Sequence, residues 1–122
     1  MTFEIPGKTF TAPAAADLSS YRYKGVYLDY GGKAAVPAAG AAIDGVLQNR
    51  PSVMGRSAVL MKNGLTKMIA AETITPGQDL SVDAQGAALV ADSGERIVGR
   101  SVTGGDATEL ITVALGNDGS VA

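Results

Sequence analysis

The sequence predicts an all-β protein: a small barrel or sandwich built from two internally repeated β-meander units, with an extended N-terminal arm. Three observations lead to this prediction. Short runs rich in β-branched residues are bounded by Gly, Asp, Asn and Pro, as strands usually are. The runs are evenly spaced, and no long helical pattern interrupts them. A shift of 54 residues aligns residues 20–65 with residues 74–119 without a gap.

The N-terminal arm is predicted to cover residues 1–17, which lie outside the repeat. It holds two of the five prolines and little charge, a composition that favours extended chain. Phe3, Ile5 and Phe10 are its apolar anchors, and we expect them to pack on the domain or on a neighbouring protein. Residues 18–122 are expected to form a single β-domain.

The repeat is supported by the kinds of residue that recur. Nine of the 46 aligned positions are identical, and they include glycines at expected turns, such as Gly32 with Gly86 and Gly40 with Gly94. Glycine has a physical reason to recur at turns, because it adopts positive φ angles without a steric penalty. We therefore interpret the two units, about 20–65 and 74–119, as a duplication.

Each unit is expected to contain the same series of strands. In the first unit these are residues 26–29, 34–37, 43–47 and 57–61. In the second unit they are residues 80–83, 87–90, 96–102 and 110–115. Between the units, residues 65–70 are predicted to pair with residues 58–61 in a hairpin across Lys62-Asn63-Gly64, because Asn-Gly favours hairpin turns. Residues 75–78 have the Pro-Gly pattern of a type II turn.

The residue types that the chain lacks exclude several kinds of chemistry. It has no Cys and no His, which rules out disulfides, the usual zinc sites and Ser–His or Cys–His nucleophilic pairs. Its Asp and Glu residues lie near expected turns, where capping is their ordinary role. A net charge of -2 and few aromatics do not suit a nucleic-acid groove. We expect no enzyme, no catalytic residue, no metal, no cofactor and no nucleic-acid partner.

Hydropathy indicates no membrane partner. No run of the sequence approaches the about 18 apolar residues that a membrane-spanning helix requires. The N-terminal residues lack the basic segment followed by an apolar run that marks a secretory signal. Synthesis in a cytoplasm is therefore expected.

Lys62 supports an alternative interpretation. Met61-Lys62 resembles half of the biotin-attachment motif, in which a turn lysine is flanked by methionines. Biotinyl and lipoyl carrier domains are also small β-sandwiches with internal pseudo-twofold symmetry. Asn63 stands where the second methionine would be, so we interpret Lys62 as an ordinary turn residue. A carrier domain with Lys62 as its attachment site, or another β-barrel assembly or binding module, remains the alternative.

Tyr21 and Tyr23 alternate with Arg22 and Lys24 in a basic and aromatic segment. On a strand, the two tyrosines would share one face and the two basic residues the other. Tyrosines on an exposed strand are typical of protein interfaces. We therefore expect Tyr21 and Tyr23 to contact a protein partner.

The second repeat unit carries a resemblance to a known family. Residues 74–86 resemble a family segment in which a strand is entered through a Pro-Gly turn, and residues 97–101 resemble its returning strand. Residues 109–115 resemble its closing strand, and the Pro-Gly and Ala/Thr-rich arm is also similar. The family is that of the capsid cement proteins of tailed bacteriophages, also called decoration or head-stabilising proteins. The similarity extends over nearly the whole chain.

The resemblance implies a structural virion protein, made in the host cytoplasm, that binds the outer surface of a phage capsid. Such a protein stabilises the capsid by bridging neighbouring major capsid subunits, and its partners are the major capsid protein and itself, as a homotrimer. Several weak patches that engage together give strong attachment. The residues expected at the capsid or oligomer interface are Phe3, Ile5, Phe10, Tyr21 and Tyr23.

Overall fold

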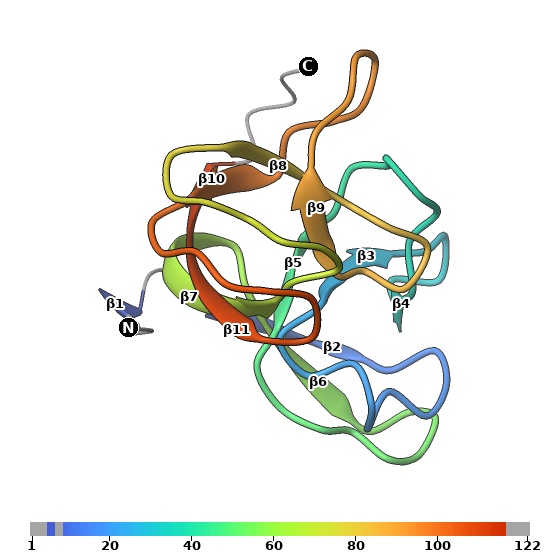
Figure 1. The fold of residues 1–122 in the computed structure, drawn as a ribbon. Helices are drawn as coiled ribbons and strands as arrows, with labels where there is room; N and C mark the ends of the chain where they lie inside the picture. Colours follow the sequence, from blue (N-terminus) through green and yellow to red (C-terminus); the bar gives the residue numbers. More distant parts are fainter. Residues whose placement is uncertain (1–4, 7–8, 117–122) are drawn as a thin grey trace.

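This computed structural model describes residues 5–6 and 9–116 of the chain. These residues contain eleven short strands, which form two antiparallel sheets (Figure 1). The six-stranded sheet contains, in spatial order, β1 (Ile5–Pro6), β7 (Asn63–Ile69), β11 (Leu110–Gly116), β10 (Gly99–Ser101), β8 (Asp79–Val82) and β9 (Ala88–Val90). The five-stranded sheet contains β2 (Thr9–Pro13), β6 (Ser57–Met61), β5 (Gly45–Leu47), β3 (Gly25–Leu28) and β4 (Ala34–Ala35). The all-β fold class is thus confirmed.

The same 54-residue offset relates the strands of the two sheets. It carries β3, β4, β5 and β6 onto β8, β9, β10 and β11, and it carries β2 onto the start of β7. Each set has the same spatial order within its sheet. The register between β3 and β5 equals that between β8 and β10, because Gly25 opposite Val46 corresponds to Asp79 opposite Arg100, whereas the pairings of β6 and of β11 differ by one residue. Each sheet is therefore built mainly from one unit.

An aspartate organises the same turn in each unit. The Asp29 carboxylate accepts amide hydrogen bonds at 2.9 Å from residues two and four positions later, and the Asp83 carboxylate does the same at 2.8 and 2.9 Å. The glycine that follows each aspartate by three positions has a left-handed φ, 73° at Gly32 and 78° at Gly86. Asp-to-amide bonds of this kind favour turns over continued strand.

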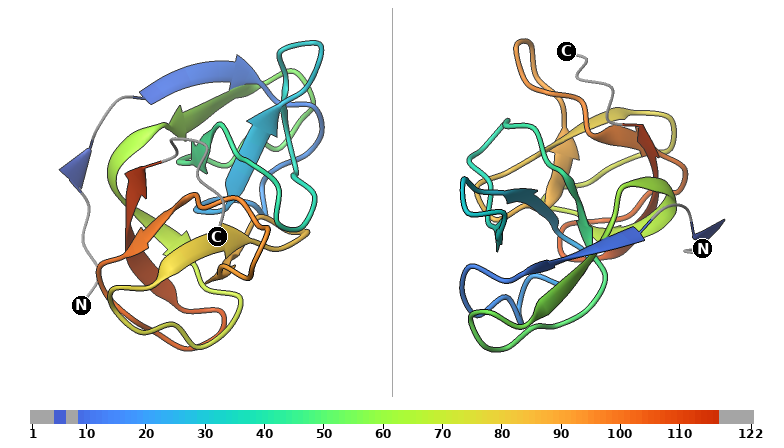
Figure 2. Two further views of the ribbon diagram at one scale, coloured as in Figure 1. Left: turned by 90° about the horizontal axis from the view of Figure 1, so that it is seen from above. Right: turned by 180° about the vertical axis from the view of Figure 1, so that it is seen from behind.

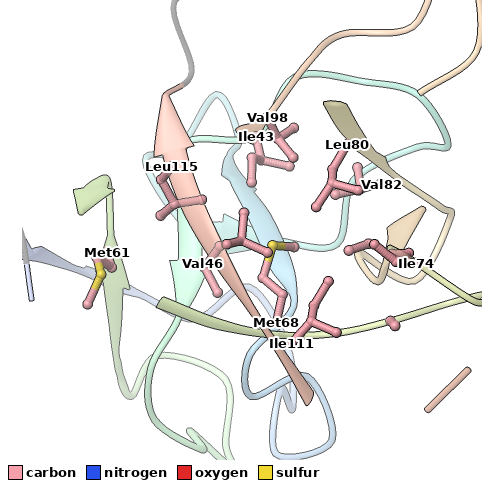
Figure 3. Packing of buried hydrophobic residues seen from close by; sticks show 13 residues of the cluster. Ile43, Val46, Met61, Met68, Ile74, Leu80, Val82, Val98, Ile111 and Leu115 are labelled. Carbon is pink, nitrogen blue, oxygen red and sulfur yellow. The ribbon is translucent and has the colours of Figure 1, made fainter. Parts of the chain in front are cut away.

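Buried apolar side chains from both sheets form one cluster between them (Figure 3). Val46 from β5 lies with Met68 from β7 and Ile111 from β11, and none of the three is exposed to solvent. Burying each such side chain contributes about 1.5–3 kcal/mol. A second cluster, which includes Leu47 and Leu60, lies against the five-stranded sheet. The two units therefore share a core, as a barrel or sandwich requires.

The prediction of a hairpin across Lys62 is wrong. β6 pairs with β2 and β5, whereas β7 pairs with β1 and β11, so the chain passes from one sheet to the other at Lys62. The Asn-Gly preference for a hairpin is overridden because each strand has a partner on both of its edges. Gly64, with a φ of 100°, helps the chain to turn at the crossing.

Part of the predicted arm lies within the domain. β2, at residues 9–13, pairs with β6 over five residues, and Ala12 and Ala14 are buried. The side chains at its inward positions, Phe10, Ala12 and Ala14, are apolar, so the segment fits as the border strand of the sheet. None of the described residues forms a helix, and so none forms one that could cross a membrane.

Candidate interaction surface

The basic and aromatic segment forms a turn, and the strand predicted there is absent. The Lys24 N–H donates to the Tyr21 carbonyl at 3.0 Å, and Tyr23 has a φ of 64°. This left-handed conformation costs a residue with a side chain about 1–2 kcal/mol. It is held by two main-chain bonds, from the Tyr23 N–H to the Leu47 carbonyl (2.7 Å) and from the Ile69 N–H to the Tyr23 carbonyl (3.0 Å).

Cations stack on both tyrosine rings of this turn. The Arg22 guanidinium carbon lies 4.6 Å from the centre of the Tyr23 ring, and the Lys24 Nζ lies 5.1 Å from that of Tyr21. The Lys67 Nζ, from β7, lies 5.8 Å from the Tyr23 ring. Each contact contributes about 0.5–1 kcal/mol at an exposed site. The predicted separation of tyrosines and basic residues onto opposite faces is therefore wrong.

Tyr23 lies in a shallow depression of about 360 Å³ that joins the two units. We call this the Tyr23 surface, and its main lining residues are Arg22, Tyr23, Arg50, Ile69, Thr108 and Leu110. Thr108 has a φ of 70°, and its N–H donates to the Ala70 carbonyl at 2.8 Å. Among the described residues, Tyr23 and Thr108 are the two that adopt positive φ without being glycine. Both are anchored at the end of β7, and strained backbone of this kind often marks functional sites.

The Tyr23 surface is cationic. The Arg22 Nε donates to the Gln48 carbonyl and the Arg50 Nε donates to the Ser19 carbonyl, each at 3.2 Å. These bonds fix both guanidinium groups beside the depression, and no carboxylate is among the described residues that line it. Leu110 adds apolar surface, with 39% of its side chain exposed. Arg, Tyr and exposed apolar side chains together are the composition of protein interfaces.

One carboxylate orders the loop that enters this surface. The Ser19 N–H donates to the Asp17 carboxylate at 2.9 Å, and this hydrogen bond lowers the pKa of Asp17 below its ordinary value. Among the described residues, no three or more Asp and Glu side chains come together in a group that could hold a metal ion.

The structure separates the five residues that the sequence places at an interface. Phe10 and Tyr21 are partly buried and pack against the core of the five-stranded sheet. Tyr23 lies in the depression described above. Ile5 belongs to β1, opposite Leu65, but its side chain lies outside the described part of the chain, and so does the whole of Phe3.

Other residues of the Tyr23 surface were missed by the sequence analysis. Arg50, Thr108 and Leu110 come from segments far apart in the chain, so no local pattern connects them. The sequence did place Asp106 and Glu109 near an expected turn, and in the structure the Glu109 N–H donates to the Asp106 carbonyl at 3.0 Å while the Glu109 carboxylate accepts the Asp106 N–H at 2.6 Å. The sequence held no signal that this turn meets Tyr23.

Lys62 lies at the crossing between the sheets, beside two depressions of about 230 and 380 Å³. Asp44 also lines both, and the two side chains are exposed. The Asp44 carboxylate accepts the Leu28 N–H at 2.7 Å, which ties down the end of β3. This arrangement gives Asp44 a structural role, and Lys62 does not lie in the hairpin turn that the carrier-domain interpretation assumed.

The geometry defines a small two-sheet β-domain with a cationic, aromatic surface. No protein-family model matches the chain, and no curated protein matches its sequence. Among solved structures, the fold is similar to that described as the head fiber gp8.5 N base in bacteriophage phi29, with a TM-score of 0.73. The match covers 94% of this chain and 98% of the other, at 18% sequence identity. At this identity the likeness shows the shared fold.

Proposed function

We propose that this chain is a structural protein of a phage virion, located on the outer surface of the head. It binds the capsid there and stabilises it by bridging neighbouring major capsid subunits, as a homotrimer made in the host cytoplasm. The observation that carries the proposal is the fold similarity to a phage head fiber base over 94% of the chain. The role is adhesive and requires no catalysis.

The Tyr23 surface supports this proposal as the place of attachment. Tyr and Arg are the residues most often found at the energetic centres of interfaces. Main-chain bonds hold the Tyr23 backbone and the Arg22 and Lys67 cations flank its ring before a partner arrives, so little side-chain freedom is lost on binding. Three copies that engage together would convert a weak contact into a durable one.

The test is binding to capsids assembled from the major capsid protein of the phage that encodes this chain. The wild-type protein is expected to sediment with the capsids and to raise their melting temperature. Tyr23→Ala is expected to weaken binding by about 2 kcal/mol, or about 30-fold. Failure of the wild-type protein to sediment with the capsids would refute the proposal.

Tyr30→Ala is the matched control, because Tyr30 is fully exposed and is not among the residues that line the Tyr23 surface. It removes the same side chain and is expected to bind as the wild type does. Alanine at position 23 keeps the left-handed penalty of tyrosine, so the two variants differ mainly in the surface that they remove. Equal losses of capsid affinity in both variants would show that the Tyr23 surface is not the place of attachment.

A further inference from the structure

Over residues 9–12, the outer edge of β2 has no strand beside it among the described residues, whereas just beyond β2 the chain bridges from Ala14 to Ala34 of β4. β2 comes first in the spatial order of the five-stranded sheet, and β6 is the one strand of the described residues that forms a ladder with it (Figure 2). It is five residues long and carries no charge, and its Thr9 and Thr11 side chains are exposed. Proteins commonly protect sheet edges with charges, bulges or covering segments, because an open edge pairs readily with another chain.

The hydrogen-bond pattern shows which groups of β2 face outward. Ala14, just beyond β2, donates its N–H to the Arg56 carbonyl at 2.8 Å. In an antiparallel pair, every second residue bonds to the partner strand, so Ala12 and Phe10 also face β6. The main-chain groups of Thr9 and Thr11 therefore face away from the sheet.

Two other sheet edges are covered by the chain itself. Along β9, the Ala71 N–H donates to the Ala88 carbonyl at 2.7 Å, and the Glu72 carboxylate accepts the Val90 N–H at 2.9 Å. Along β4, the residues that directly follow β2 cover the edge, since the Ala15 N–H donates to the Ala34 carbonyl at 2.8 Å. The open edge of β2 thus differs from these two edges of the same fold.

The repeat indicates what an edge of this kind accepts. Thr11 corresponds, at the 54-residue offset, to Leu65 of β7. There β1 occupies the outer edge as a short antiparallel strand, with Ile5 opposite Leu65. The second unit therefore has its edge filled by an extended segment at the position that is open in the first.

We propose that the outer edge of β2 accepts an extended segment of the capsid protein as an added antiparallel strand, in register with Thr11. Strand addition of this kind gains affinity from main-chain bonds and specificity from side-chain pockets. A depression of about 380 Å³ adjoins the start of β2 and has room for one side chain of the added strand; it is lined by Thr9, Phe10, Leu28, Asp44 and Lys62. The inference rests on the proposed capsid attachment and names a second place where it occurs.

A second copy of this chain fits the edge less well. If two β2 strands paired with each other about Thr11, Thr9 of one would lie opposite Pro13 of the other. Pro13 has no N–H, so the ladder would lose a bond at both ends. A capsid segment without proline at these positions loses that bond at the Pro13 end alone.

The test compares Thr11→Pro with Thr11→Val in capsid sedimentation. Proline removes the outward N–H of position 11 and leaves the bonds to β6 in place, and proline is tolerated on edge strands. Thr11→Pro is expected to keep its melting temperature within a few degrees and to lose about tenfold or more in capsid affinity. Thr11→Val keeps the N–H and is expected to bind within about twofold of wild type.

Hydrogen exchange of the wild-type protein gives a second measurement that does not depend on a variant. The Thr11 amide is expected to exchange about tenfold or more slowly when capsids are bound. Binding by Thr11→Pro that equals wild type, or an unprotected Thr11 amide in the complex, would overturn the strand proposal while the proposed function stood. An oligomer that dissociates in Thr11→Pro without capsids present would assign the edge to a second copy instead. Failure of wild type to bind would refute the proposed function itself.

Discussion

The repeated turn offers an internal comparison that tests the packing of the two units against each other. Gly32 and Gly86 occupy the same place after Asp29 and Asp83, and both have left-handed φ angles. A Cβ atom added at Gly32 would meet nothing within 4 Å. A Cβ atom added at Gly86 would lie well under 3.0 Å from the main-chain oxygen of Gly25 in β3. The same substitution therefore meets open space in one unit and backbone in the other.

The expected magnitudes follow from this difference. Alanine in a left-handed conformation costs about 1–2 kcal/mol, and lower entropy of the unfolded chain offsets about 0.4–1 kcal/mol of it. Gly32→Ala should therefore destabilise by about 1 kcal/mol. Gly86→Ala also forces the backbone apart, at about 1–3 kcal/mol. It strains the 2.7 Å bond from the Gly25 N–H to the Gly86 carbonyl, at about 1 kcal/mol, so about 3–5 kcal/mol in total is expected.

Urea unfolding and calorimetry of the two variants would measure this difference. For a domain of this size, each kcal/mol lowers the melting temperature by about 4 °C. Gly32→Ala should therefore lose about 4 °C and Gly86→Ala about 12–20 °C. If the two free energies of unfolding differ by less than about 1 kcal/mol, the turn of the second unit does not press on β3, and the reasoning fails.

Three further predictions concern single side chains. Ser101→Ala should lower the free energy of unfolding in urea by about 1–3 kcal/mol. The reason is that the buried Ser101 hydroxyl accepts the Gln78 N–H (2.9 Å) and donates to the Thr75 carbonyl (2.6 Å), and an unchanged urea midpoint would contradict this. Thr108→Gly should stabilise by about 0.5–1 kcal/mol by relieving the left-handed backbone, and a lower melting temperature would count against strain there. The lowered pKa of Asp17 contributes stability above the ordinary carboxyl pKa, which is lost as pH falls through the lower folded value. Asp17→Asn should therefore weaken the pH dependence of the melting temperature below about pH 4, and identical acid profiles would refute this.

The sequence alone predicted the strands and turns well, because these depend on neighbouring residues. The strand predicted at 57–61 is β6 with the same bounds, and those predicted near 26–29 and 80–83 are β3 and β8 within one residue. Left-handed glycines were predictable too, since Gly77 follows Pro76 in the expected turn and has a φ of 85°. The 54-residue offset was visible in the sequence before the strands that it relates were known.

Strand pairing was less predictable. Asn63-Gly64 signals a hairpin locally, yet β6 and β7 belong to different sheets. A local signal worth a few tenths to about 1 kcal/mol is overridden when each strand gains a full ladder and a buried face elsewhere. The same reason places residues 9–13 in the five-stranded sheet, although their proline and low charge suggested an arm.

The sequence by itself therefore determined the elements of this protein: its short strands, its turns, its duplication and the absence of cysteine and histidine chemistry. Only the tertiary structure decided where these elements meet. Tyr23 comes together with Arg50 and Leu110, and the edge of β2 stays open, because two sheets pack around one core. Contacts between residues so distant in the chain leave no periodic or local trace, since they are set by how the whole chain buries its apolar surface.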